Sequence, residues 1–237
     1  AGVDTAGRII PPGLPSVCPL RILTVDCQLD HLFLVARAWA ADGSSRLIWN
    51  ERVLTFTDVA TVQERFGVHS SLVFLDAGYA TYDVYRECAK RGWVALIGDR
   101  RPVYAHKGRD GKTVQRFYSP RRKVVLSHRQ HCHVHYWSNL NIKDTLARLR
   151  RNQNPDDGPV WEVPDDIDED YLAQMEGEHR IKKGGKWLWE RIGKRPNHYW
   201  DCEAMQVAAA VMLKLVGQES VKVDAEIKAE DDEPTAD

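Results

Sequence analysis

One apolar segment in the last quarter of the chain constrains the fold more than any other part of the sequence. Residues 204–216 are Ala-rich and apolar, and only Gln206 and Lys214 interrupt them. Ala, Leu and Met favour helix, and a helix that is apolar on all sides has to be surrounded by protein. The segment therefore predicts a buried helix against which the rest of the chain packs.

An aspartate opens this predicted helix. A carboxylate in the first turn, such as Asp201, is favoured by the helix dipole and by unpaired amide groups, so capping alone explains it. Two earlier residues favour a second explanation, because Asp26 ends the apolar run 22–25 and Asp76 ends the apolar run 72–75. Two buried strands and one buried helix would then each contribute a carboxylate to a metal site. The pattern predicts a metal-dependent nuclease with Asp26, Asp76 and Asp201 as catalytic residues and metal ligands.

The order of the predicted elements indicates an α/β fold with a mixed central sheet. Three consecutive strands come first, two of them joined at an Asp-Gly hairpin turn, and helices then alternate with strands. The predicted strands are 21–26, 31–40, 46–53, 71–76 and 93–97, and the predicted helices are 57–66, with Thr57 as a candidate cap, 81–91, 141–150 and 168–178. This alternation implies parallel strands joined by right-handed crossovers, and such sheets bind ligands beyond the carboxyl ends of their strands. Asp26 and Asp76 both occupy such ends.

Basic residues gather in two stretches. Residues 100–129 hold ten Lys or Arg and one acid, with a hairpin turn expected at Asp110-Gly111. Residues 179–196 hold seven Lys or Arg and one acid, and Gly184-Gly185 indicates the turn of a basic β-hairpin. The simple explanation of residues 100–129 is a solvated loop, and that of residues 179–196 is a hairpin that closes the sheet with its Trp residues packed inward. Aromatic residues among many cations are, however, also typical of surfaces that bind along the phosphates of a nucleic acid. The candidate DNA-binding residues are Arg100, Arg101, Lys107, Arg109, Arg121, Arg122, Lys123, Lys182, Lys183 and Lys186.

Four of the nine histidines fall within residues 127–135. On a strand, His131, His133 and His135 share one face, where neighbours lie about 7 Å apart at a rise of ~3.3 Å per residue. This spacing is too wide for three ligands of one zinc ion without bending. Sheet packing or partial DNA contact is therefore favoured over a zinc site.

The charge of the chain is unevenly distributed. The net charge is −1 over 237 residues, but residues 217–237 hold eight acids and two lysines, a charge of −6, which leaves +5 for residues 1–216. A basic body with an acidic tail is typical of a polyanion binder whose tail is disordered or reserved for a partner. The five scattered cysteines indicate reduced thiols, and no apolar run reaches the roughly 18 residues that span a bilayer.

Four segments of the sequence, in this order, resemble a known family. They are residues 23–28 (Leu-Thr-Val-Asp-Cys-Gln), 74–81 (Phe-Leu-Asp-Ala-Gly-Tyr-Ala-Thr), 171–178 (Tyr-Leu-Ala-Gln-Met-Glu-Gly-Glu) and 197–203 (Asn-His-Tyr-Trp-Asp-Cys-Glu). Together they resemble the C-terminal nuclease domain of the large terminase subunit of lambda-like phages, the motor that packages viral DNA. The ordered set is more specific than any one segment and frames residues 21–216.

The resemblance implies a ribonuclease H-like fold and a Mg²⁺- or Mn²⁺-dependent endonuclease that cuts concatemeric double-stranded DNA, with its acidic cluster at Asp26, Asp76 and Asp201. Three carboxylates suit these hard ions. Two metal ions are expected about 3.5–4 Å apart, with Asp26 as the ligand that bridges them. Glu203 lies about 200° from Asp201 on a helix, so it is expected to face away from the ions. The basic stretch 100–129 is longer than expected for the family.

The resemblance also implies a context for the domain. Family members carry a packaging ATPase domain, and because this sequence shows no nucleotide-binding loop, it corresponds to the nuclease half. The expected organisation is a linker at residues 1–20, a nuclease domain at 21–216 and an acidic, disordered tail at 217–237. Expected partners are double-stranded DNA, the ATPase domain, the portal and the small terminase subunit, with no membrane. The expected location is the host cytoplasm rather than the mature virion.

Two other functions fit the same residues. A Holliday-junction resolvase or transposase of the same architecture would prefer branched DNA to linear DNA. A non-enzymatic module that binds DNA and docks on the portal would use the three Asp residues only as caps and surface charges, and metal would change nothing.

Overall fold

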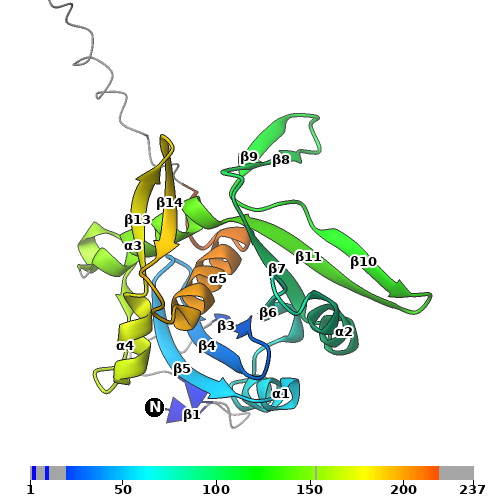
Figure 1. Cartoon of the computed structure of the whole chain (residues 1–237), viewed down its shortest axis with the longest axis horizontal. Coiled ribbons are helices and arrows are strands. Elements are labelled where there is room, and N and C mark those ends of the chain that lie inside the picture. Colours follow the sequence, from blue (N-terminus) through cyan, green and yellow to red (C-terminus); the bar gives the residue numbers. More distant parts are fainter. Residues whose placement is uncertain (1, 4–8, 11–19, 153, 219–237) are drawn as a thin grey trace, which may run out of the picture.

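An eight-stranded mixed sheet with helices on both faces forms the centre of the molecule (Figure 1). The computed structural model describes residues 2–3, 9–10, 20–152 and 154–218. Across the sheet the strands follow the order β10-β11-β7-β6-β3-β4-β5-β12. The mixed α/β fold predicted from the sequence is therefore confirmed, and it is compatible with a ribonuclease H-like nuclease.

The elements have the following bounds. The strands of the sheet are β3 (Leu20–Cys27), β4 (Leu32–Trp39), β5 (Ser45–Val53), β6 (Val73–Asp76), β7 (Val94–Asp99), β10 (Arg122–Ser127), β11 (Gln130–Ser138) and β12 (Trp161–Glu162). Three further pairs are β1 (Gly2–Val3) with β2 (Ile9–Ile10), β8 (Tyr104–Lys107) with β9 (Thr113–Arg116), and β13 (Glu178–Lys183) with β14 (Lys186–Arg191). The helices are α1 (Phe56–Arg65), α2 (Thr81–Arg91), α3 (Asn139–Arg151), α4 (Glu169–Met175) and α5 (His198–Met212), with single 3-10 turns η1 (Ser70–Leu72) and η2 (Pro155–Asp157).

The strand directions follow the predicted connections. β3, β4 and β5 pair antiparallel, as expected for strands joined by short turns. β6 pairs parallel with both β3 and β7, and β7 pairs parallel with β11. Helix α2 provides the crossover between β6 and β7, so the carboxyl ends of these parallel strands meet at one edge of the sheet.

Helix α5 is the buried helix that the sequence predicts. Its residues from Cys202 to Val211 are all buried, and its small Ala side chains allow it to lie close to β3 and β4. Gln206, which interrupts the apolar pattern, is buried and joins α5 to β3 and β4 by hydrogen bonds. Its amide nitrogen donates to the carbonyl oxygens of Ile22 and Val35 at 3.0 and 2.9 Å, and its amide oxygen accepts from Trp39 Nε1 at 3.0 Å. A buried amide with these partners avoids the cost of unpaired polar groups.

Side chains alternate between the two faces of the sheet and so decide which residues face α5. On β3, Ile22 belongs to the core shared with α3, α4 and α5, whereas Leu23 and Val25 belong to the core under α1 and α2. Because successive side chains of a strand point to opposite faces, Asp26 shares the face of Ile22 and Thr24. The hydroxyl of Thr24 confirms this direction, since it donates to the carbonyl oxygen of Cys202 in α5 at 2.9 Å.

Three predicted boundaries are wrong by a few residues. The cap of α1 is Thr55 rather than Thr57, because Thr55 and Asp58 form a reciprocal capping box with bonds of 3.2 and 2.8 Å. The predicted strand 71–76 begins as η1, and only its last four residues are in β6. The predicted helix 168–178 ends at Met175, and a Cβ at Gly177 would collide with the Pro196 carbonyl oxygen, so the chain can turn there only with glycine.

The predicted linker and acidic tail lie largely outside the described residues. Where it is described, the linker forms the short β1–β2 pair. Four cysteines fall within the described chain, and all four are free and buried, in keeping with the predicted reduced thiols. No helix in the described ranges has the length and apolar character needed to cross a bilayer.

Candidate functional site

Two of the three predicted aspartates lie next to each other at the carboxyl edge of the sheet. β3 and β6 are adjacent and parallel, and their register pairs Val25 with Leu75, so Asp26 and Asp76 are the next residues on each strand. Phe74 packs in the core shared with α5, and Asp76, two residues further on, points to the same face. The topology therefore turns both carboxylates toward the first turn of α5.

Asp201 joins this edge from the helix side. A solvent-open cavity of about 180 Å³ is lined by Asp76 and Asp201 together with Gly78, Gly98, Trp137, Asn139 and Met205. Asp201 and Met205 are four residues apart on α5, which puts both on the face of the helix that borders the cavity. The N-cap residue of α5 is Asn197, so Asp201 is not the cap that the simpler explanation requires.

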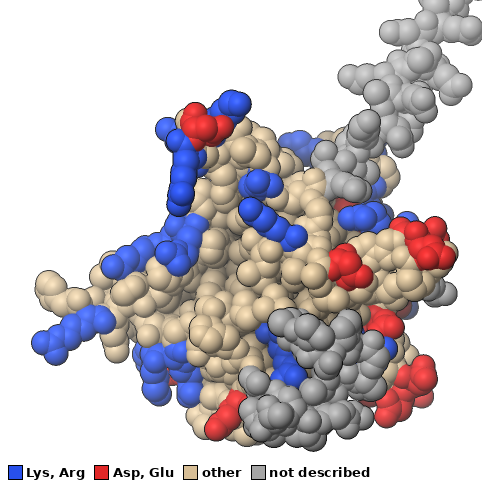
Figure 2. Space-filling model, turned by 180° about the vertical axis from the view of Figure 1, so that it is seen from behind, with Lys and Arg blue, Asp and Glu red and all other residues tan. Residues whose placement is uncertain are grey.

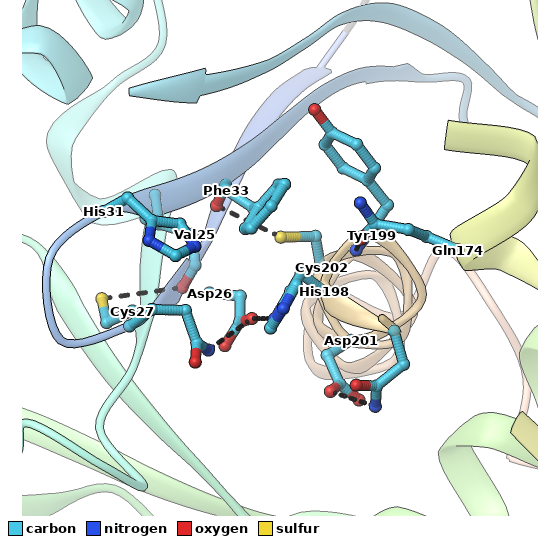
Figure 3. A network of polar contacts seen from close by, with 12 residues as sticks. Val25, Asp26, Cys27, His31, Phe33, Gln174, His198, Tyr199, Asp201 and Cys202 are labelled. Atoms are coloured by element: carbon cyan, nitrogen blue, oxygen red, sulfur yellow. Dashed lines mark hydrogen bonds and ion pairs between the residues drawn. The ribbon is translucent and has the colours of Figure 1, made fainter. Parts of the chain in front are cut away.

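Asp26 is the most enclosed of the three aspartates. It is 3% exposed, and its Oδ2 accepts hydrogen bonds from His198 Nδ1 at 2.7 Å and from Gln28 Nε2 at 2.8 Å. His198 in turn stacks on Phe33 with ring centroids 4.5 Å apart. Figure 3 shows Asp26 reaching from β3 to His198 at the start of α5, with Asp201 further along the same helix. Both hydrogen bonds fix the orientation of this carboxylate through one oxygen.

The electrostatics of the three carboxylates show that they affect one another. Burial, the charge of Asp26 and, to a smaller extent, the charge of Asp201 together raise the pKa of Asp76 to about 7, against the lowering effect of a hydrogen bond from Gly78 N at 3.0 Å. Burial also raises the pKa of Asp201, while Lys143 acts in the opposite direction. Repulsion between neighbouring carboxylates is the state that a bound cation relieves.

Sequence reasoning missed two polar residues beside Asp201. Lys143 of α3 lies 2.8 Å from Asp201 Oδ1 and 2.8 Å from both carboxylate oxygens of Glu178. The lysine is 2% exposed, and burial lowers its pKa less than Asp201 and Glu178 raise it, so it stays a cation. Glu178 ends the segment 171–178 that resembles the family, and this resemblance was the one sequence signal that could have pointed to it. No sequence signal pointed to Lys143, because a lysine on an amphipathic helix is usually exposed to solvent.

The donor atoms of the site suit a hard divalent cation. The hydrogen bonds to Asp26 go to Oδ2 and the one to Asp76 goes to Oδ1, which leaves one oxygen of each free among the described residues. Carboxylate oxygens are the preferred ligands of Mg²⁺ and Mn²⁺. Within the described ranges, however, no three His, Cys, Asp or Glu side chains are close enough together to hold a metal ion. An ion would therefore have to draw Asp26, Asp76 and Asp201 together.

Glu203 faces away from this edge, as predicted. Its carboxylate is fully buried, 2.8 Å from Arg37 Nε and 2.5 Å from the Tyr171 hydroxyl. The guanidinium of Arg37 also donates to Ser45 Oγ at 3.0 Å and lies 3.5 Å from the centre of the Trp161 ring. This network joins β4, α4 and α5, so Glu203 has a structural role.

The ten candidate DNA-binding residues are all exposed. Arg100 and Arg101 follow β7, Lys107 and Arg109 lie at the tip of the β8–β9 hairpin, and the others lie on or directly before β10 and on the β13–β14 hairpin. Both hairpin turns occur where Asp110-Gly111 and Gly184-Gly185 predicted them. Figure 2 shows Lys and Arg over the side that carries β8 to β11, while Asp and Glu gather on the opposite side.

Three of the four histidines, His131, His133 and His135, lie on β11, and His128 lies in the turn between β10 and β11. His131 and His133 have ring centroids 5.5 Å apart, whereas His135 Nδ1 lies 2.9 Å from the carbonyl oxygen of Ser119. His131 is exposed, and His135 is tied to the backbone at Ser119, so the three rings have different surroundings.

Comparison with known proteins identifies the family. Residues 12–221 match the family described as terminase large subunit gpA, endonuclease domain. No curated protein matches the chain, and no solved structure does. The match spans most of the chain, including the carboxylate edge and both basic hairpins. The chain therefore belongs to the terminase large subunit gpA endonuclease-domain family, which gives it a nuclease role in phage DNA packaging.

Proposed function

We propose that this domain is a Mg²⁺- or Mn²⁺-dependent endonuclease that cuts concatemeric double-stranded DNA during genome packaging, with Asp26, Asp76 and Asp201 as its catalytic residues. One observation carries the proposal. Asp26 and Asp76 end adjacent parallel strands on the face toward α5, and Asp201 borders the same cavity as Asp76. A helix cap or a solvated surface charge requires neither this convergence nor the raised pKa of Asp76.

Asp26, Asp76 and Asp201 would hold the divalent ions between them, because these are the carboxylates that meet at this edge. When bound, the ions supply an activated water and stabilise the leaving oxygen. Hydrolysis joins the water oxygen to phosphorus and breaks one P–O ester bond, whose oxygen leaves with a proton. His198 and Gln28 hold Asp26 in place during this step, since both bind its Oδ2. Such supporting contacts typically contribute 10–100-fold to metal affinity or activity.

The substrate is proposed from the charge of the surface. The exposed cations on β10 and on the β8–β9 and β13–β14 hairpins would contact phosphates without reading the base sequence, so binding would weaken as salt rises. In the packaging motor the domain would act with an ATPase domain, the portal and the small subunit, in the host cytoplasm.

A plasmid-cutting assay tests the proposal. Supercoiled plasmid is incubated at low salt with EDTA, Mg²⁺ or Mn²⁺ and either wild-type protein or Asp26→Asn. Wild type should nick or linearise the plasmid only with a divalent ion, and Asp26→Asn should lose more than about 100-fold of this activity while binding DNA as before in a gel shift. Asp165→Asn, which changes an exposed aspartate away from the cavity, is the matched control and should cut like wild type.

Each other outcome has a defined meaning. Equal cutting by wild type and Asp26→Asn would refute the site. DNA binding without cutting under any ion would favour the docking module, and a strong preference for four-way junctions over linear duplex would favour the resolvase.

A further inference from the structure

A buried lysine holds one of the three aspartates of the site. The ammonium group of Lys143 lies 2.8 Å from Glu178 Oε1, Glu178 Oε2 and Asp201 Oδ1. An ammonium group has three N–H donors, so these three oxygens use its whole donor capacity. Lys143 is therefore fully committed to two carboxylates, one of which borders the cavity.

The same two carboxylates share a second partner. Asn197 Nδ2 lies 2.7 Å from Glu178 Oε1 and 2.8 Å from Asp201 Oδ2, and Trp200 Nε1 donates to Glu178 Oε2 at 3.1 Å. Both oxygens of Asp201 thus have partners, whereas Asp26 and Asp76 each keep one free oxygen among the described residues. The three aspartates are not equally ready to bind a cation.

We propose that Lys143 is a built-in cation that holds Asp201 away from the second divalent ion, so that the two ions load in sequence. The first ion binds Asp26 and Asp76 through their free oxygens. The second binds only when Asp201 exchanges the ammonium group for the metal. This inference rests on the proposed metal-dependent function and assigns a positioning role to Lys143 and Glu178.

The charges of the site support this order. At pH 8, where Asp76 is ionised as well, four carboxylates (Asp26, Asp76, Asp201 and Glu178) and one ammonium group give −3. One divalent ion reduces the charge to −1, so a second ion enters a site with little negative charge left and has to compete for Asp201. Without the ammonium group the second ion would meet −2 and an uncontested carboxylate, and it would bind more tightly.

A purely structural ion pair would not explain the exposure of the three groups. Lys143 and Glu178 are almost fully buried, with side chains 3% and 7% exposed, whereas the Asp201 side chain is 29% exposed and lines the cavity. The ammonium group thus has a buried partner that fixes it and a second partner that a cation from solvent can reach. Glu178 keeps Lys143 in place when Asp201 leaves it.

The test is a Mn²⁺ titration of the full 237-residue chain without DNA, in which electron paramagnetic resonance measures the free ion. Wild type should bind one Mn²⁺ tightly and a second at least about tenfold more weakly. Lys143→Met, which keeps an unbranched side chain that is one atom shorter and removes the charge, should tighten the second site by about tenfold and leave the first closer to wild type. Lys143→Arg, which retains the charge, should resemble wild type, and Asp201→Asn should bind a single ion.

A second variant guards against loss of folding in Lys143→Met. Glu178→Gln frees Lys143 to pair with Asp201 alone, so its second site should weaken further, opposite to Lys143→Met, while circular dichroism reports the fold. Unchanged dissociation constants in both variants would overturn the role of Lys143 and leave the proposed nuclease standing. Absence of Mn²⁺ binding by wild type and all variants would overturn the metal-dependent function and this inference with it.

Discussion

Asp76 is the residue in which stability and the proposed catalysis oppose each other. Its carboxyl group is enclosed beside Asp26 and Asp201, and its pKa rises to about 7 from the ordinary value of 3.8. The folded protein therefore holds a proton on Asp76 that the unfolded chain releases above about pH 4. Folding stability is lost as pH rises from about 4 to 7, and the full penalty remains above pH 7.

Asp76→Asn should consequently stabilise the metal-free protein. At pH 8 in EDTA the variant should gain on the order of 1–3 kcal/mol of unfolding free energy, a range that allows for solvent in the cavity. At about pH 4, before the unfolded chain has released most of the Asp76 proton, the gain should nearly vanish. Chemical denaturation at both pH values measures this difference, and an equal gain at the two values would show that the repulsion is not its cause.

At the scale of residues, the sequence predicted that Asp26 and Asp76 lie side by side at the edge of the sheet, and their catalytic role stays a prediction. Asp26 and Asp76 were found because each follows an apolar run, and parallel strands bring such ends together. Lys143 was not found because it lies on another helix, 35 positions from Glu178, and its burial depends on packing that no local pattern encodes. His198 lay inside a recognised segment, but its bond to Asp26 spans 172 positions.

At the scale of elements, the hairpins were the easiest to predict. Asp110-Gly111 and Gly184-Gly185 favour tight turns because glycine adopts the positive φ that such turns need, and Gly111, Gly184 and Gly185 have φ values of 77°, 58° and 76°. Boundaries set by tertiary contacts were harder. The end of α4 depends on the approach of the Pro196 carbonyl to Gly177, which only the folded chain reveals.

The β10 strand and the residue before it should contribute to DNA binding through their exposed charges. Arg121→Ala with Arg122→Ala should weaken binding of a linear duplex and reduce the dependence of log affinity on log salt by about one unit for each phosphate that the protein no longer neutralises. A second double variant, Lys90→Ala with Arg151→Ala, removes two exposed charges from α2 and α3 and is the control. Equal salt slopes in the two double variants would show that β10 makes no special contribution.

At the scale of the whole molecule, charge is segregated along the sequence as well as on the surface. Residues 219–237, which lie outside the described chain, carry the eight acids and two lysines that offset the basic body. Removing them should therefore raise DNA affinity at low salt, and the gain should shrink at high salt as charges are screened. Fluorescence anisotropy over a salt series measures both effects. An unchanged affinity would indicate that the segment does not compete with DNA.

The separation of the site residues along the chain has a consequence for biosynthesis. β3, β6 and α5 supply the carboxylates, and the bond that joins the first of these elements to the last closes almost three quarters of the chain. Contacts of such long range are slow to form, because closing the intervening loop costs entropy. A ribosome-bound chain that still lacks α5 cannot bring Asp201 to Asp26 and Asp76, so under the proposed function DNA would meet a competent nuclease only once synthesis has passed α5.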